Sequence, residues 1–270
     1  MSDAILDGFT DALKLAHVSW RPVLRAGLDA VARANPAYLP ALAGDSFLPT
    51  EGRIFAAFSQ PLESVRYVLV GEGPYPRPES ATGYAFMDGA VHALWSEKGL
   101  AKQVNRATSL RNFMKMLLVA DGHLQKGETS GAALEPVAVQ ANSPGSAWIQ
   151  TREELQDKLL QQGFLLLNAA LVFRPDVPPL KEARAWQPLL QAVLAALAEQ
   201  AQARKAEPPV LVLWGKAAEL LDALPANALF PRVISEHPYN LSFIDHAGMQ
   251  KLFGAMHLLQ ASSDNRTHVK

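Results

Sequence analysis

The sequence predicts a three-layer α/β/α fold with a central four-stranded parallel sheet. Four short apolar runs have the length and composition of buried strands, and segments with helical spacing of apolar residues separate them. Because strands that alternate with helices form parallel sheets with right-handed crossovers, this pattern indicates the α/β class. The predicted strands cover residues 67–70, 164–168, 210–215 and 232–235.

Helices are predicted where apolar residues recur at helical spacing or where capping signals occur. Residues 4–31 have this spacing, and Pro22 is expected to open a second helix within them. Thr151-Arg-Glu-Glu154 is a capping-box pattern before a helix that ends near residue 163. Thr108 or Ser109 is a suitable N-cap for the next predicted segment. The remaining helices are predicted at residues 109–118, 188–204, 216–224 and 248–260.

The connections and the domain organisation follow from composition. Residues 35–48 are rich in Pro, Ala and Gly and are expected to be a connection. Residues 121–149 have little periodicity and are expected to form a long loop with at most one short helical turn. No convincing linker interrupts the strand pattern, so the chain is expected to form one domain over residues 1–270. A helical N-terminal extension is expected at residues 1–60 and a frayed tail at residues 261–270.

Composition narrows the classes of function. The chain has 270 residues, of which 49% are hydrophobic and 19% charged, as in globular proteins with a sizeable core. The formal net charge of −1 gives no global basic field, although a nucleic-acid groove needs only a local cluster of cations. The chain has no cysteine, which excludes disulfides, thiolate catalysis, cysteine-ligated zinc and cysteine-bound iron–sulfur clusters.

The sequence also indicates where the protein acts. Its N-terminal residues carry acids and lack the basic and apolar regions of a signal peptide. No apolar stretch approaches the roughly 20 residues that a membrane span requires. A cytoplasmic protein without membrane contact is therefore expected.

The chain is organised around the stretch Arg66-Tyr-Val-Leu-Val-Gly-Glu-Gly-Pro-Tyr-Pro-Arg77. Its apolar run stops at two glycines and Pro74, which allow unusual backbone angles and close approach of a ligand. Glu72 therefore lies at the carboxyl end of a buried strand, where open α/β sheets bind their ligands. The simpler interpretation is an ordinary turn with a solvated acid.

Polar groups follow the other predicted strands as well. If the sheet is parallel, these groups converge on one edge, with Tyr75 and Phe86 as flat apolar walls. A carboxylate, an amide and an imidazole beside aromatic rings suit a planar polar ligand such as a nucleobase, because an Asn side chain matches the donors and acceptors of a base edge. The strand-end groups are Glu72, Asn168, the Gly215-Lys216 turn and His237.

Six segments together resemble the uracil-DNA glycosylase superfamily in their order and spacing. They resemble, in order, its water-activating loop, its base-stacking Phe segment, a DNA-contacting helix start, the uracil-reading strand, the third strand end and the motif with the catalytic His and the Leu wedge. The resemblance covers roughly residues 60–260. The six segments are residues 68–75, 82–86, 109–113, 165–169, 213–216 and 237–242.

The chain departs from the known families at two motifs. The family 1 loop is Gly-Gln-Asp-Pro-Tyr-His, so Gly73 stands at the place of the catalytic Asp and Pro76 at that of the His. The iron–sulfur family 4 enzymes carry Gly-Glu-Ala-Pro-Gly, in which the catalytic Glu matches Glu72, but this chain lacks their cluster cysteines. The usual His-Pro-Ser-Pro-Leu is replaced by His237-Pro-Tyr-Asn-Leu241, which changes the residues of the phosphate pinch.

The resemblance implies a uracil-DNA glycosylase-like fold and the hydrolysis of the N-glycosidic bond of uracil, or of a related deaminated base, in flipped-out DNA. It implies no cofactor, no metal, single- or double-stranded DNA as the partner, and action as a monomer. The implied residues are Glu72 and His237 for catalysis, Tyr75, Phe86 and Asn168 for base binding, and Ser109, Lys216, Leu241 and Ser242 for DNA binding.

Simpler alternatives remain for each residue. The alternative for Asn168 is a hydrogen bond to the backbone where the strand leaves the sheet, and for His237 it is a strand-end cap. The alternative for Tyr75, Phe86 and Leu241 is a place in the core. The other histidines have no ligand spacing. With Gly73 at the place of the Asp, the alternative function is a catalytically degenerate glycosylase fold that binds DNA or a nucleobase without cleavage. An unrelated α/β hydrolase is disfavoured, since the chain has neither a Gly-x-Ser-x-Gly elbow nor a phosphate loop.

Overall fold

The computed structural model describes residues 9–222 and 224–261. Contacts divide the chain into two compact units. The sheet unit comprises Met1–Gly89 and Gly163–Ile234, and the helical unit comprises Ala90–Gln162 and Ser235–Lys270. The helix predicted to begin at residue 4 and the predicted frayed tail lie partly outside the described residues. The single-domain organisation stays a prediction.

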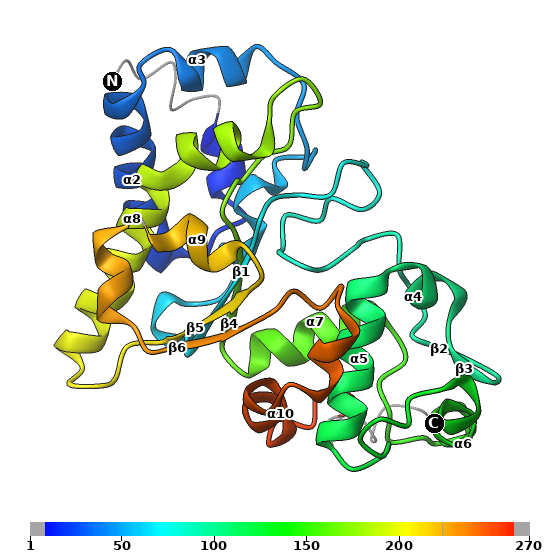
Figure 1. The fold of residues 1–270 in the computed structure, drawn as a ribbon. Coiled ribbons are helices and arrows are strands. Elements are labelled where there is room, and N and C mark those ends of the chain that lie inside the picture. The colour runs from blue at the N-terminus through cyan, green and yellow to red at the C-terminus, as the bar shows by residue number, and fades with distance from the viewer. Residues whose placement is uncertain (1–8, 223, 262–270) are drawn as a thin grey trace. The chain divides into compact units, whose positions relative to one another are not determined.

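The sheet unit is built on a four-stranded parallel sheet in the order β4-β1-β5-β6 (Figure 1), as predicted. The central strand β1 pairs in parallel with both β4 and β5, in a register that places Gly71 opposite Asn168. All five residues of β4 and the middle of β1 are buried, which explains why these strands are continuous apolar runs. The strands are Tyr67–Gly71 (β1), Phe164–Asn168 (β4), Val210–Trp214 (β5) and Arg232–Ser235 (β6).

Helices α2 and α8 pack along one another in the sheet unit (Figure 1). Gly27 permits this close approach, because a Cβ at this position would lie 2.9 Å from Cγ of Leu189. Pro22 lies in the first turn of α2, as predicted. The helical elements of the unit are η1 (Val18–Trp20), α2 (Arg21–Ala34), α3 (Tyr38–Ala43), η2 (Arg53–Phe58), η3 (Leu62–Ser64), α8 (Pro179–Ala203), α9 (Ala217–Asp222) and η4 (Pro225–Leu229).

Two predictions for this unit are wrong in part. Residues 35–48 are not only a connection, because they contain α3, which buries Tyr38 and two leucines. Helix α8 begins at Pro179 rather than at residue 188. A proline in the first turn lacks only an N–H that has no partner in the helix, so Pro179 is tolerated at the start. The second proline, Pro188, lies inside the helix.

A buried polar cluster joins α3 to the segment after β4 and to α8. Glu182 is 2% exposed and accepts hydrogen bonds from the hydroxyl of Tyr38 and from Nε and Nη2 of Arg174. The Nη1 group of Arg174 also reaches Asp45 at 3.3 Å. A buried carboxylate is tolerated only when it is paired and hydrogen-bonded, so this cluster holds the N-terminal helices to the rest of the sheet unit.

In the helical unit, α5 packs against η5 and α10 (Figure 1). The predicted helices at residues 109–118, 151–163 and 248–260 are present, although the last ends at Gly254. The elements of the unit are β2 (Trp95–Ser96), β3 (Gly99–Leu100), α4 (Lys102–Arg106), α5 (Thr108–Ala120), α6 (Gly131–Ala141), α7 (Arg152–Gln161), η5 (Leu241–Asp245) and α10 (Ala247–Gly254).

Two further predictions are wrong. Residues 121–149 are not a long loop, because α6 occupies their middle. Ser130 caps this helix, and its hydroxyl accepts a hydrogen bond from the amide of Ala133. Helix α5 has Ala107 as its N-cap and no side-chain cap bond, so neither Thr108 nor Ser109 has the predicted capping role.

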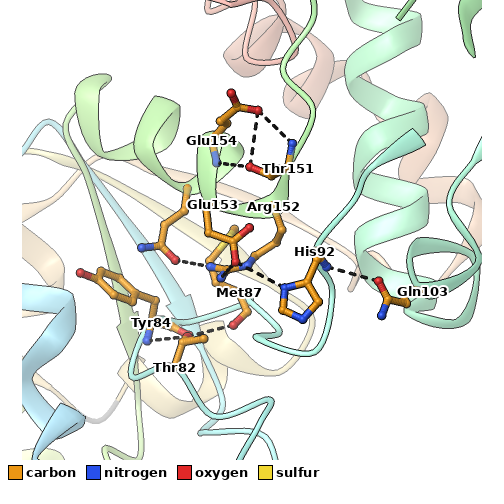
Figure 2. Close-up of polar contacts among 10 residues, drawn as sticks. Thr82, Tyr84, Met87, His92, Gln103, Thr151, Arg152, Glu153 and Glu154 are labelled. Atoms are coloured by element: carbon orange, nitrogen blue, oxygen red, sulfur yellow. Dashed lines mark hydrogen bonds and ion pairs between the residues drawn. The ribbon is translucent and has the colours of Figure 1, made fainter. Parts of the chain in front are cut away.

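The predicted capping box of α7 is confirmed (Figure 2). The amide of Glu154 donates to Oγ1 of Thr151 at 3.2 Å, and the amide of Thr151 donates to Oε2 of Glu154 at 2.9 Å. Figure 2 also shows the Glu153 carboxylate between Arg152 and His92, at 2.6 Å and 3.8 Å. These contacts fix the start of α7 on the strand-like segment at His92, whose carbonyl accepts the amide of Arg152.

Within residues 9–222 and 224–261, no helix has both the length and the apolar character needed to cross a membrane.

Candidate active site

The nine residues predicted for the site are divided between the two units. The sheet unit contains the predicted catalytic residue Glu72 and the predicted DNA-binding residue Lys216. It also contains the three predicted base-binding residues, Tyr75, Phe86 and Asn168. The helical unit contains the other catalytic residue and three DNA-binding residues, namely His237, Ser109, Leu241 and Ser242.

The ends of β1 and β4 are held together in the sheet unit. The amide of Ala169 donates to the carbonyl of Gly71 at 2.8 Å. Asn168 is 4% exposed, and its Oδ1 lies so close to Gly71 that a Cβ there would be 2.5 Å away. The glycine is therefore required by close approach of the Asn168 side chain, because any larger residue would displace the amide.

Glu72 follows directly on this anchored strand end. Its carbonyl accepts the amide of Ala170 at 3.0 Å, so its backbone continues beside the chain that leaves β4. The Glu72 side chain is exposed. It lines a cavity of about 190 Å³ with Gly73, Pro74 and Arg174. The arrangement presents a carboxylate on a fixed backbone at the carboxyl edge of the sheet, where α/β proteins bind ligands.

The loop that carries Phe86 is attached to the same region. The amide of Ala85 donates to the carbonyl of Leu166 in β4 at 2.9 Å. Thr82 braces the loop, since its Oγ1 donates to the carbonyl of Met87 at 2.9 Å and accepts the amide of Tyr84 at 3.2 Å (Figure 2). These bonds lie on either side of Phe86 and fix its backbone.

Phe86 itself has a φ of 68°, in the left-handed region that non-glycine residues rarely adopt. Such strain persists only where the surroundings impose it, and it is frequent at functional sites. The ring packs edge-to-face on Trp214 at the end of β5, with centroids 4.9 Å apart and planes at 77°. The loop that carries Phe86 therefore lies against the ends of β4, which finishes at Asn168, and of β5, which finishes at Trp214, on either side of β1.

Tyr75 joins this group through a long hydrogen bond of 3.5 Å from its hydroxyl to the carbonyl of Phe86. Burial, together with the negative charge of Asp88, raises the pKa of Tyr75 to about 12, and Arg77 offsets part of that rise. Since the phenol remains protonated at neutral pH, Tyr75 is an uncharged wall of the candidate site. The structure therefore brings the three predicted base-binding residues into one place.

The raised pKa of Tyr75 has a testable consequence for stability. A group whose pKa is higher in the folded protein contributes stability that is complete below its ordinary pKa of 10.0 and is lost as the pH rises through about 12. Between pH 10 and 12, the free energy of unfolding of the wild type should therefore fall by on the order of 2 kcal/mol more than that of Tyr75→Phe. Chemical denaturation across this range measures both. Parallel pH profiles would refute the burial of the phenol.

In the helical unit, His237 opens a tight turn. The amide of Asn240 donates to the carbonyl of His237 at 2.9 Å and closes the turn around Pro238. The amide of Tyr239 donates to Nδ1 of His237 at 3.1 Å. Because an amide can only donate, Nδ1 must accept, and the proton of the neutral imidazole is on Nε2. The geometry thus prepares Nε2–H as a hydrogen-bond donor.

Asn112 of α5 is hydrogen-bonded to this turn. It is not among the site residues predicted from the sequence. Its side chain is fully buried, and Nδ2 donates to the carbonyls of Pro238, Tyr239 and Asn240 at 2.7, 3.3 and 3.4 Å. Its Oδ1 accepts Nε of Arg111 at 3.4 Å. One signal in the sequence could have identified Asn112: it is an amide on the apolar face of an amphipathic helix, inside the segment that resembles the DNA-contacting helix start.

Replacement of Asn112 by Ala should destabilise the protein and disable the turn. The three carbonyls would lose a shared buried donor, at a cost of about 1–3 kcal/mol in the free energy of unfolding. The matched control is Asn142→Ala, since Asn142 also donates to two carbonyls of the helical unit, at 3.0 and 2.8 Å, but does not touch the turn. Both variants should lose stability in denaturant titrations, whereas only Asn112→Ala should lower the rate at saturating substrate. Equal rates would contradict this role.

The predicted DNA-binding residues differ in their surroundings. Lys216 is exposed after Gly215, whose φ is 58°. Ser109 is half-buried in the first turn of α5. Leu241 is 69% exposed, the highest fraction among the large hydrophobic side chains that are exposed in the described residues. A hydrogen bond from the Ser242 hydroxyl lowers the pKa of Glu236, so part of the hydrogen-bonding capacity of Ser242 is used within the protein. Their contacts with DNA stay predictions.

In the described part of the chain, no group of three or more His, Asp or Glu side chains is arranged to hold a metal ion.

A parallel sheet whose strand ends carry a carboxylate, an amide and aromatic rings defines an α/β protein with a ligand site at the carboxyl edge. No protein-family model matches the chain. The uracil-DNA glycosylase of Corynebacterium glutamicum is 30% identical over 230 residues, which cover 84% of this chain and 81% of that relative.

Solved structures of uracil-DNA glycosylases (UNG) are similar to this chain as well. The crystal structure of the wild-type UNG from Nitratifractor salsuginis superimposes with a TM-score of 0.82 at 37% identity, covering 94% of this chain and 97% of that chain. A tyrosine-to-glycine mutant of the same UNG superimposes with a TM-score of 0.84 at 36% identity, and the match covers 95% of this chain and 100% of that chain. The chain therefore belongs to the uracil-DNA glycosylase family. The resemblance seen in the sequence is confirmed.

Proposed function

We propose that this protein excises uracil from DNA by hydrolysing the bond between N1 of the base and C1′ of the sugar. Its membership of the uracil-DNA glycosylase family supports this function. The observation that supports the proposal in the structure is the position of Glu72, whose backbone is fixed directly after the strand end where Gly71 is paired with Asn168. No feature of the described site or of the compared proteins favours binding without cleavage.

The proposed recognition step uses the sheet unit. The deoxyuridine leaves the base stack, and its base stacks on Phe86 while the Asn168 amide pairs with its polar edge. Tyr75, held at the carbonyl of Phe86, crowds C5 of the base and so excludes thymine, whose methyl group has no space. Leu241, which is exposed on the helical unit, fills the position that the base has left.

The proposed chemical step divides the developing charges between two residues. As the glycosidic bond lengthens, the uracil oxygens become negative and the sugar becomes positive. The Nε2–H of neutral His237 donates to the uracil oxygen, a preorganised electrostatic effect. Glu72 stabilises the cationic sugar and orients the water that adds to C1′, as carboxylates do in glycosidases. The proton released by the water balances the uracil anion.

The proposal includes a monomer that acts in the cytoplasm on single- or double-stranded DNA without a cofactor. Light scattering on the purified protein tests the monomer: a mass of 29.3 kDa is expected, and a stable dimer would contradict it.

The function is tested by an abasic-site assay on labelled oligonucleotides. Parallel substrates contain uracil, hypoxanthine, xanthine or a thymine mismatch, and alkali cleaves any abasic site. Cleavage at uracil and none at thymine is expected from the crowding by Tyr75. Cleavage at thymine would refute that role, and no cleavage at any base would refute the proposed function.

A further inference from the structure

Tyr239 is the residue after Pro238 in the turn that His237 opens, and its side chain is 68% exposed. Leu241, two residues on, is 69% exposed. Of the large hydrophobic side chains that are exposed in residues 9–222 and 224–261, Tyr239 is the only aromatic one. These two exposed apolar side chains flank Asn240 on one turn, and no other part of their own unit covers them.

The backbone beneath these two side chains is fixed. The amide of Tyr239 donates to Nδ1 of His237, and its carbonyl accepts Nδ2 of Asn112. The amide of Phe243 donates to the carbonyl of Asn240 at 3.3 Å and continues the turn into η5. The backbone of Tyr239 is thus held at both its amide and its carbonyl. Little backbone entropy is lost when the ring binds a ligand, so the contact is preorganised.

A basic segment packs against the turn, which itself is flanked by the acids Glu236 and Asp245. Residues 98–120, which include α4 and α5, contain five lysines and arginines and no aspartate or glutamate. Helix α5 packs against η5 and holds the turn through Asn112. Burial, together with the positive charge of the neighbouring Arg111, lowers the pKa of Lys115. Exposed apolar side chains beside an acid-free basic segment form the pattern of single-stranded nucleic-acid binding, in which cations follow the phosphates and aromatic rings stack on bases.

We propose that Tyr239 is a base-stacking residue whose ring takes up an unpaired base of single-stranded DNA adjacent to the excised nucleotide. This inference rests on the proposed function, which supplies the DNA. Tyr239 stands where the usual family motif His-Pro-Ser-Pro-Leu has a serine, and a serine has no ring on which a base can stack.

Tyr239 is expected to strengthen binding to single-stranded DNA more than binding to a duplex. In a duplex, the neighbouring bases already stack on one another, so an additional ring gains little. In a single strand, the same base is free, so stacking on an aromatic side chain strengthens binding. Leu241 is expected to matter more in a duplex than in a single strand, because there it fills the position that the flipped base leaves in the opened base pair.

The test measures binding and cleavage separately. Fluorescence polarisation with a uracil-free single strand and with the matching duplex gives the Kd of Tyr239→Ser, Tyr239→Phe and Leu241→Ala. Tyr239→Ser should raise the Kd for the single strand about 10-fold and that for the duplex less than about 3-fold, and Tyr239→Phe should leave both within about 2-fold. An oligonucleotide with 2-aminopurine should be quenched by the wild type and less by Tyr239→Ser. Leu229→Ser is the control, since Leu229 is 59% exposed on the sheet unit.

An unchanged Kd in Tyr239→Ser, or equal losses in the Ser and Phe variants, would overturn the proposal. Because the binding strand contains no uracil, these outcomes are independent of catalysis. Failure of uracil release with Tyr239-dependent binding would refute the proposed function and support the stacking site.

Discussion

Glu72→Gln is expected to lower the rate of uracil release by at least ~100-fold, the loss that follows removal of a catalytic group from a glycosidic reaction. The substitution keeps the size of the side chain and removes its charge, so a cationic sugar would lose its electrostatic partner. Single-turnover release of uracil from a labelled oligonucleotide measures this rate. The backbone hydrogen bond from Ala170 to Glu72 does not depend on the side chain, so folding should be unchanged.

The matched control is Glu79→Gln. Glu79 is an exposed acid of the same loop and lies 3.9 Å from Arg77. An exposed ion pair of this kind contributes little to stability, and this side chain has no place in the proposed chemistry. Its variant should release uracil at the rate of the wild type. A similar loss in both variants would assign the effect to the general charge of the loop rather than to Glu72.

Gly73→Asp extends this test to the departure from the family 1 loop. A Cβ at this position would lie 3.4 Å from Cβ of Ala170, an ordinary contact, so the side chain is accommodated. In the double variant with Glu72→Gln, the new carboxylate should restore part of the lost rate, because it occupies the place of the family 1 aspartate. No recovery would mean that the carboxylate must come from position 72.

His237→Ala should also lower uracil release by at least ~100-fold, because the uracil oxygen would lose a donor that is already oriented. The effect should fall on the rate at saturating DNA more than on affinity. The measurement is single-turnover release over a range of enzyme concentrations, which separates the two. A loss of affinity alone would contradict the catalytic role of the imidazole.

The control for this histidine is His246→Ala. His246 is the N-cap of α10, and its Nδ1 also accepts a backbone amide, that of Met249 at 3.3 Å. The variant should lose about 1 kcal/mol of stability, as other caps do, and keep its rate. The pair of variants thus separates the loss of a hydrogen-bonded ring from the loss of a catalytic donor.

The strands could be predicted from the sequence because burial on both faces makes them continuous apolar runs. Phe164–Asn168 is an example, since all its residues are buried. Helix α6 was missed because Gly131 and Pro136 disfavour helix and its periodicity is weak, while Ser130 supplies a cap and tertiary packing buries Leu134 and Val137.

The candidate site was predictable where position along a strand determines it. Asn168 is the last residue of β4 and Glu72 directly follows β1, and parallel strands bring such residues to one edge. Two features were beyond the sequence. The left-handed φ of Phe86 has no signal in a non-glycine residue. The contact of Asn112 with Pro238 joins residues 126 positions apart, and only the packing of α5 on η5 reveals it.

The most direct test of uracil excision by this protein is the release of free uracil by the wild type in a single turnover. The protein is incubated in excess over a uracil-containing single strand, and the free base is quantified by mass spectrometry alongside the abasic product. We expect one uracil and one abasic site for each strand cleaved, although Gly73 stands at the place of the family 1 aspartate. Tight binding of the strand with no free uracil would contradict it.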